Sequence, residues 1–291
     1  IVFGGQQLML QILFNGLLNG AVIALPAIAF TMLFGILKFP NFSIGAFITV
    51  GAYAAMVANT YFGWQLWLSA IFAMLITALL IWLSDQLVFK PLRSATSITL
   101  LVVSIAVAFI VESIIRLIFG GDIQGLDLEL TRPIRFGGFR FTIDQLWIIG
   151  IVMLVMLLVS IILKYTQLGK AMRATSDNFD LAEVRGINTS HVIAATWLMG
   201  GLLLGLSGLL IGIDLVIEPQ IGWFLTIPVF AAAILGGIGS PYGAMIGSVL
   251  VGLAEELTGA FLAPSYKVAV GFVIIAILLM FRPQGLFGLP Q

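Results

Sequence analysis

HVIAATWLMGGLLLGLSGLLIGI, at residues 191–213, is a run without Asp, Glu, Lys or Arg. A helix that crosses a bilayer needs about 20 mostly apolar residues, and this run is long enough for one crossing. In hydrocarbon the backbone has to satisfy its own hydrogen bonds, which an α-helix does within a single segment. The run therefore predicts a membrane-spanning helix.

Apolar runs of the same kind fill the rest of the chain. Of the 291 residues, 61% are hydrophobic and only 9% are charged, whereas soluble domains carry about 25% charged residues. With short loops, this length holds roughly eight to ten spans in one domain, residues 1–291. The fold class that we predict is therefore all-α: a polytopic bundle of membrane-spanning helices. We also expect a cytoplasmic coupling loop, which is the inner loop at residues 164–190 described below. Interruptions by charges and turn residues place the spans near 8–36, 42–60, 65–83, 96–118, 145–163, 191–213, 224–238, 241–257 and 266–281.

The basic residues indicate how the bundle is oriented, because short cytoplasmic loops carry an excess of Lys and Arg. One side of the bundle holds Lys38, Lys90, Arg93, Lys164, Lys170, Arg173, Arg185 and Arg282. We expect that side to be cytoplasmic, with the N-terminus outside and the C-terminus inside. This orientation requires the apolar stretch 224–257 to split into two spans around Gly239, Ser240 and Pro241.

The longest segment expected on the outer side is residues 119–144. It contains glycine-rich turns between charged residues. We predict an outer loop with one short hairpin around Gly137 and Gly138.

The inner loop, residues 164–190, is the only sizeable segment expected on the cytoplasmic side. It reads as two short helices broken near Thr175 to Asn178, where Asp177 or Asn178 is placed to cap the second one. The chain has no G-x-x-x-x-G-K-[ST] loop for nucleotide phosphates, so an ATPase that powers transport has to be a separate chain. Because the inner loop is helical, mixed in charge and joined to two spans, it is the natural docking place for such an ATPase.

The composition also argues against several other classes. The net charge is zero and no basic run exceeds two residues, so the chain offers no surface that tracks the phosphates of DNA or RNA. It contains no cysteine and a single histidine, His191, which argues against disulfides and metal centres. An intramembrane enzyme would need a G-x-S-x-G elbow or an H-E-x-x-H helix, and neither motif is present. A secondary transporter would need acidic ion-coupling groups near the midplane, for which Glu112 is the one obvious candidate.

Several polar side chains lie inside the predicted spans. Asn15 and Asn19 are four residues apart and so share one face of the first helix. They are either hydrogen-bond partners of another helix or part of a polar translocation path. Asn41 and Ser43, at the start of the second span, leave the same two alternatives open.

Glu112 lies within the fourth span, where a charge near the bilayer centre costs roughly 2.5–3.5 kcal/mol on insertion scales. Arg116 lies one turn farther toward the outside, and an i, i+4 pair offsets part of that cost. The pair is either structural or lines the translocation path. We expect solvated positions at the outer ends of spans, open to an external partner, for Asp214, Glu218, Glu255 and Glu256.

Glycines repeat at helical spacing in the span at 191–213. Gly201, Gly205, Gly208 and Gly212 are spaced four, three and four residues apart, which places them on one face of the helix. Small faces let helix backbones approach closely in lipid. We interpret this face as tight packing within the chain, with a subunit interface or a moving interface as the alternative.

Five longer segments carry a family resemblance. They are NGLLNGAVIALPAIAFTMLFGIL at 15–37, KFPNFSIGAFITVGAY at 38–53, GKAMRATSDNFDLAEVRGIN at 169–188, AAILGGIGSPYGAMIGSVLVGLAEEL at 232–257 and FRPQGLFG at 281–288. Together they resemble the permeases of ABC importers for branched-chain amino acids, a group that also includes importers of urea and short amides. One short run departs from the family, which often has Ala-His-Gly after the Asn-Phe of the second segment, whereas residues 43–45 read Ser-Ile-Gly here.

The resemblance implies a permease subunit of a bacterial inner-membrane importer that forms the translocation path by alternating access. The implied partners are a second related permease, two ABC ATPases that bind the ATP, and an external solute-binding protein, so this chain would itself bind no cofactor. The implied solutes are branched-chain or related amino acids, with urea, short amides or small carboxylates as alternatives. By position, the ATPase-coupling loop would contain Arg173, Asp177, Glu183, Arg185 and Gly186.

Overall fold

The computed structural model describes residues 2–128, 132–136, 139–282 and 285–287. In this part of the chain, eight helices are long and apolar enough to cross a membrane, and a further apolar helix, α9, is shorter. Apart from a two-stranded hairpin, the named elements in the described ranges are helices, which confirms the predicted all-α polytopic class. The helices are α1 (Val2–Leu37), α2 (Ser43–Met56), α3 (Leu66–Ser84), α4 (Ser97–Phe119), α5 (Ile143–Tyr165), α6 (Gln167–Asp177), α7 (Phe179–Val184), α8 (Thr189–Asp214), α9 (Ile221–Gly236), α10 (Pro241–Phe261) and α11 (Lys267–Phe281).

The predicted break in the apolar stretch 224–257 is confirmed, and it lies between α9 and α10. Gly237 and Gly239 have positive φ angles of 108° and 86°, a conformation that glycine adopts without a steric cost. The hydroxyl of Ser240 then accepts a hydrogen bond from the backbone N–H of Gly243 at 3.1 Å and caps α10. The chain therefore turns between α9 and α10, which pack against each other, and this is the break that the predicted orientation assumes.

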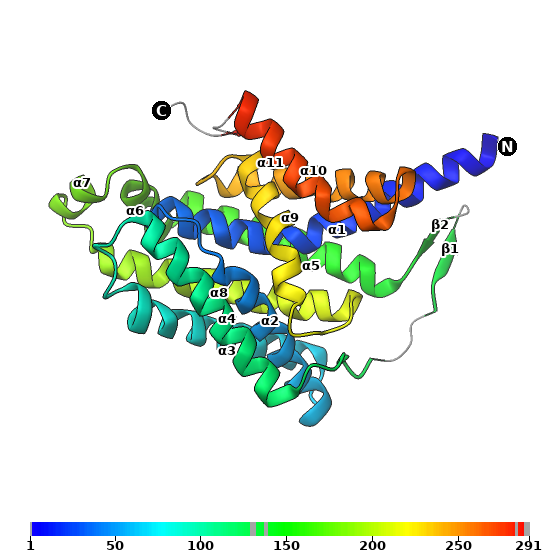
Figure 1. Cartoon of the computed structure of the whole chain (residues 1–291), viewed down its shortest axis with the longest axis horizontal. Coiled ribbons are helices and arrows are strands. Elements are labelled where there is room, and N and C mark those ends of the chain that lie inside the picture. The colour runs from blue at the N-terminus through cyan, green and yellow to red at the C-terminus, as the bar shows by residue number, and fades with distance from the viewer. Residues whose placement is uncertain (1, 129–131, 137–138, 283–284, 288–291) are drawn as a thin grey trace.

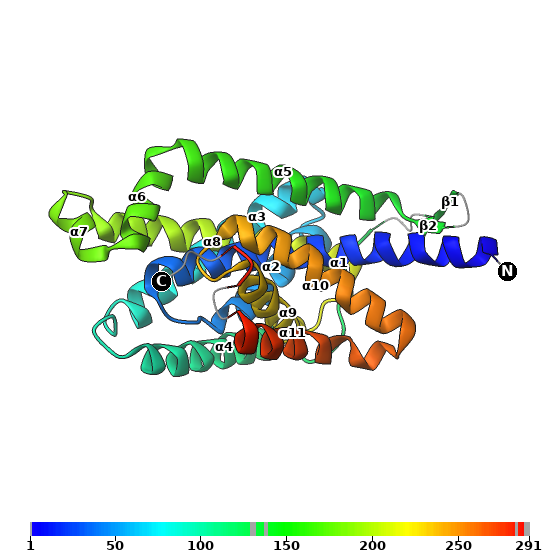
Figure 2. The same ribbon diagram turned by 90° about the horizontal axis from the view of Figure 1, so that it is seen from above.

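Helices α1 and α8 form the centre of the bundle. α1 runs through the middle of the molecule (Figure 1, Figure 2) and packs mainly against α10 and α8, while α8 packs against α3 and α2. The spans of α1, α2 and α8 are mostly buried inside the chain, whereas those of α3, α4, α5 and α11 leave most of their residues uncovered. The outer helices are therefore the ones whose apolar side chains are available to lipid or to another subunit.

The two ends of the bundle differ (Figure 1). One end carries α6 and α7, and the other holds the start of α1 beside the strands β1 (Ile134–Phe136) and β2 (Phe139–Phe141). The strands pair in antiparallel fashion with Ile134 opposite Phe141, which agrees with the predicted hairpin. Its turn at Gly137 and Gly138 lies outside the described residues.

Segments far apart in the sequence meet at the α6–α7 end. Ser176 of α6 donates a hydrogen bond to the carbonyl oxygen of Gly35, near the end of α1, at 2.9 Å. Ser97, at the start of α4, donates to the carbonyl oxygen of Lys38 at 3.4 Å. These loops, which we predict to be cytoplasmic, therefore lie at the same end of the molecule.

Candidate functional site

The helices α6 and α7 project from one end of the bundle (Figure 1) and are fixed by caps. The hydroxyl of Thr166 accepts a hydrogen bond from a backbone N–H in the first turn of α6 at 3.1 Å. The side-chain oxygen of Asn178 accepts from the N–H of Leu181 at 2.9 Å, so Asn178, and not Asp177, caps the second helix. Gly186 follows α7 with a positive φ of 83° and turns the chain back toward α8.

α7 carries an exposed apolar surface next to charged side chains. Leu181 is 53% exposed and Val184 is 84% exposed. α7 lies beyond the ends of the long apolar helices (Figure 1), where lipid tails would not cover it. Exposed apolar side chains rimmed by polar ones mark contacts with other proteins.

The predicted coupling residues fall into two groups. The guanidinium of Arg173 donates to the backbone carbonyl of Leu163, near the end of α5, so Arg173 holds α6 against the span that precedes it. Asp177, Glu183 and Arg185 are exposed, and the described residues give none of them a salt bridge. These three charges are available to a partner, whereas Arg173 is part of the scaffold.

Asn15 and Asn19 meet the same carboxylate on α10. The amide of Asn15 donates to Oε1 of Glu256 at 3.0 Å, and that of Asn19 donates to Oε2 at 3.2 Å. The ammonium of Lys267, 2.5 Å from Oε2, forms an ion pair with the same group. The two asparagines are therefore hydrogen-bond partners between helices, which is the first of the two alternatives that their spacing allowed.

The prediction that Glu255 and Glu256, near the end of α10, are solvated is wrong. Glu255 is only 8% exposed, and Glu256 is held in the network with α1. The reason is that α1 and α10 touch through their backbones here: a Cβ added to Gly16 would lie 2.9 Å from the Cα of Leu253. This close contact covers the face of α10 that would otherwise meet water.

Asn41 and Ser43 lie at the buried start of α2. The Asn41 side-chain oxygen accepts from the backbone N–H of Ser43 at 2.9 Å and from its hydroxyl at 2.6 Å. Both residues are buried, and the Nδ2 of Asn41 has no hydrogen-bond partner among the described residues. Buried donors without a partner are uncommon, so Asn41 stays a candidate for contact with a solute.

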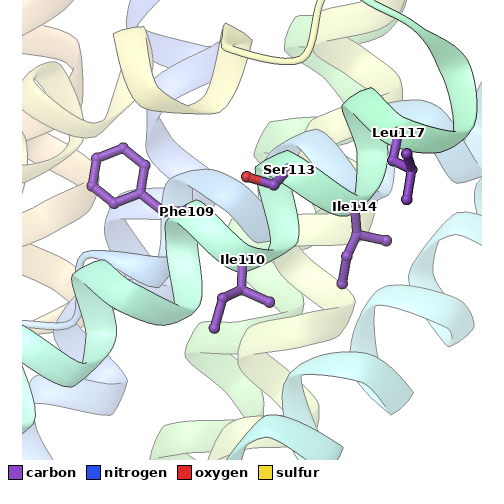
Figure 3. Close-up of a pocket in the computed structure, with 5 residues that line it drawn as sticks. All are labelled: Phe109, Ile110, Ser113, Ile114 and Leu117. Carbon is purple, nitrogen blue, oxygen red and sulfur yellow. The ribbon is translucent and has the colours of Figure 1, made fainter.

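Glu112 and Arg116 form the expected i, i+4 pair on α4, with Nη2 of Arg116 2.8 Å from Oε1 of Glu112. The pair borders a shallow hollow on the outside of the chain. Its lining consists of Phe109, Glu112, Ser113, Arg116, Leu117 and Gln220. Figure 3 shows the adjoining, more apolar part of the same surface, formed by Phe109, Ile110, Ser113, Ile114 and Leu117.

The glycine face of α8 lies against two other helices of the same chain. A Cβ added to Gly201 would lie 2.4 Å from the Cα of Ala78 on α3, and one added to Gly208 would lie 2.4 Å from the backbone nitrogen of Ala52 on α2. A Cβ added to Gly205 would lie 2.6 Å from the α3 backbone, and one added to Gly212 would meet the side chain of Ile217 at 3.0 Å. The face therefore packs within the chain.

An ion pair that the sequence analysis did not identify joins Asp85 and Arg93. Their charged atoms are 2.8 Å apart and the Asp85 side chain is fully buried. Between them, Phe89 stacks on Trp197 of α8 with ring centroids 5.2 Å apart. The two charges are eight residues apart. The π-helical turn at Asp85–Phe89 and the turns that follow it at Lys90–Arg93 bring them together, so regular helical or strand spacing would not have indicated the pair.

Long apolar helices around a buried centre, with two short helices projecting from one end, are the architecture of a polytopic membrane protein. Residues 12–279 match the family described as branched-chain amino acid transport system / permease component. The chain therefore belongs to this family. It is a transport subunit that crosses the inner membrane several times.

Individual relatives agree with this assignment. The chain is 32% identical to the high-affinity branched-chain amino acid transport system permease protein LivH of Escherichia coli (strain K12), a match that covers 97% of this chain and 96% of LivH. It is 31% identical, over the same shares, to the corresponding permease protein BraD of Pseudomonas aeruginosa. A solved chain of a transporter assigned to the metal-chelate type of ABC transporter, in an inward-facing conformation, has a similar fold, with a TM-score of 0.50 and 18% identity over 94% of this chain and 88% of that chain.

Proposed function

We propose that this chain is one of two related permease subunits of an ATP-driven importer, and that it carries branched-chain or similar hydrophobic amino acids inward by alternating access. Two ABC ATPase subunits bind and hydrolyse the ATP, and an external binding protein delivers the solute. The chain itself binds no cofactor. The observation that carries the substrate class is the similarity to LivH and BraD along almost the whole chain.

The α6–α7 pair supports the proposed docking of an ATPase. Its exposed side chains Leu181 and Val184 offer an apolar contact. Arg173 holds α6 to α5, and Ser176 holds it to the end of α1. A displacement of α6 and α7 by a docked ATPase would therefore move α5 and α1 together, as in a rigid-body movement.

The experiment that tests this proposal is uptake of labelled leucine into vesicles that carry the assembled complex and its binding protein. We expect uptake that requires internal ATP and is blocked by valine. If leucine is ignored while urea, a short amide or a small carboxylate accumulates with ATP, the substrate assignment is wrong. Leucine uptake that does not depend on ATP would contradict the proposal of an ATP-driven importer and would favour a stand-alone secondary transporter.

A further inference from the structure

The outer half of α4 carries charged groups in a place where lipid would not tolerate them well. At a rise of 1.5 Å per residue, Glu112 lies about 10 Å below the outer end of the helix at Phe119. The side chain of Glu112 is 16% exposed and that of Arg116 is 49% exposed. Charged groups at such a depth usually face protein or a water-filled path rather than lipid.

The surface beside this pair is hollow and has apolar walls. The hollow has a volume of about 550 Å³. Phe109 forms one wall and contacts Trp223 of α9, with ring centroids 5.6 Å apart. Leu117 adds apolar surface near the outer end, and Ser113 contributes a hydroxyl between the two walls (Figure 3). The hollow thus combines a carboxylate, a guanidinium and apolar walls.

We propose that this hollow is a substrate subsite that recognises a zwitterionic amino acid with an apolar side chain. Arg116 receives the α-carboxylate, Glu112 receives the α-ammonium, and the side chain of the solute lies against Phe109 and Leu117. This inference rests on the proposed function, because it takes an amino acid as the solute. It assigns recognition of the solute to this chain in addition to the external binding protein.

The pair has hydrogen-bonding capacity left for such a ligand. A guanidinium carries five N–H donors in a planar fork and can bind a carboxylate through two of them. Among the described residues the only side chain that Arg116 bonds is Glu112, through Nη2 and Oε1. Donors on Arg116 and the second oxygen of Glu112 therefore stay open for the two charged ends of an amino acid.

The absence of cysteine in the chain makes the location of this surface testable. In Ser113→Cys the new thiol lies in the hollow, and in the matched control Gly150→Cys it lies on the exposed side of α5, where a Cβ would meet nothing within 4 Å. Both positions are about 10 Å below the outer ends of their helices. A thiol reacts as the thiolate, which needs water, so a charged methanethiosulfonate reagent should modify the hollow about tenfold faster than the lipid-facing control.

The labelling is carried out on the assembled complex in vesicles and read on this chain by mass spectrometry, with and without saturating leucine. We expect leucine to slow the modification of Ser113→Cys and to leave the control unchanged. If Ser113→Cys reacts no faster than Gly150→Cys, or if leucine has no effect on its rate, the subsite proposal is overturned. Leucine uptake by the unsubstituted complex is measured in the same vesicles. Its absence would refute the proposed function, whereas its presence with an unprotected Ser113→Cys would refute the subsite alone.

Exchanging the charges of Glu112 and Arg116 tests whether the pair recognises the solute or only stabilises α4. The double variant Glu112→Arg, Arg116→Glu keeps an i, i+4 ion pair and the net charge, but it reverses the order of the charges along α4. For recognition we expect leucine uptake to fall about tenfold or more, as for the loss of a charge-assisted hydrogen bond, while the thermal midpoint of the purified protein is kept. Wild-type uptake by this variant would show that only the ion pair matters and would overturn the proposal.

Discussion

Glu256 is the side chain that accepts hydrogen bonds from the polar groups in the first half of α1. It accepts hydrogen bonds from Asn15 and Asn19 and forms an ion pair with Lys267. In an apolar environment each of these donors would be costly to leave without a partner. The carboxylate therefore links three helices, α1, α10 and α11, through one polar contact.

We predict that Glu256→Leu destabilises the protein by about 3 kcal/mol, because it leaves a partly buried ammonium and two amides without their acceptor. Glu256→Gln keeps one acceptor oxygen and should cost less, about 1–2 kcal/mol. The measurement is the thermal midpoint in detergent, with the exposed outer residue Asp122, changed to Asn, as the control. A midpoint of Glu256→Leu equal to that of Asp122→Asn would contradict the role given to this network.

The sequence indicated that Asn15 and Asn19 share a face, but it could not indicate their partner. Helical spacing relates residues on the same helix only, and Glu256 is 241 residues away from Asn15. The pairing depends on how α1 packs against α10, which is decided by backbone contacts at Gly16 and Gly252. The local pattern therefore indicated that Asn15 and Asn19 have a shared role. Their hydrogen-bond acceptor depends on the packing of helices that are distant in the sequence.

At the scale of helices, α8 is held between α2 and α3 by its glycines. We predict that Gly205→Ala lowers stability although alanine is the better helix former, because the added Cβ would lie 2.6 Å from the carbonyl oxygen of Ala73 and 2.7 Å from the Cα of Met74. The matched control is Gly150→Ala on α5, where the space is open and the better propensity should add up to about 1 kcal/mol. The two thermal midpoints should move in opposite directions. A shift of the same sign and size in both variants would count against close packing at Gly205.

The coupling helices give a second prediction at this scale. Val184→Asp places a charge on the exposed apolar side of α7 and should leave insertion unchanged while uncoupling ATP hydrolysis from leucine uptake, because the apolar contact with the ATPase is lost. The control is Val216→Asp, an exposed valine (55%, against 84% for Val184) in the loop after α8, at the opposite end of that span. ATPase activity and uptake are measured in the same vesicles. Tight coupling in the Val184 variant would exclude α7 as the docking surface.

Element positions were largely predictable because their signals are local. Apolar runs and the breakers between them gave the spans, and Gly239, Ser240 and Pro241 gave the break before α10. The π-helical turns at Val57–Tyr61 and Asp85–Phe89 were not predicted, since no residue type marks them. The second of these turns begins at Asp85 and leads into the turn that carries Arg93, so the unpredicted element and the unpredicted ion pair lie in the same segment.

At the scale of the whole molecule, buried polar contacts and exposed apolar helices are separated. α1, α2 and α8 are covered inside the chain, and α4, α5 and α11 are mostly uncovered. α5 lies on one side of α1, and α4 and α11 lie on the other (Figure 2). The hollow with Glu112 and Arg116 is on α4. If the subsite proposal holds, the second permease that completes the path lies on that second side.

The orientation of the molecule provides the last prediction. The excess of Lys and Arg in the loops near α6 and α7 should keep that end in the cytoplasm. Because the chain has no cysteine, single substitutions can report each end: Asp180→Cys on α7 and Asp122→Cys in the loop after α4, both at exposed positions. An impermeant maleimide added to intact cells should label Asp122→Cys at once and Asp180→Cys only after the membrane is opened. The reverse labelling pattern would show that the predicted orientation is inverted. It would also place α7 outside the compartment that contains ATP, so this labelling tests the proposed docking of the ATPase together with the topology.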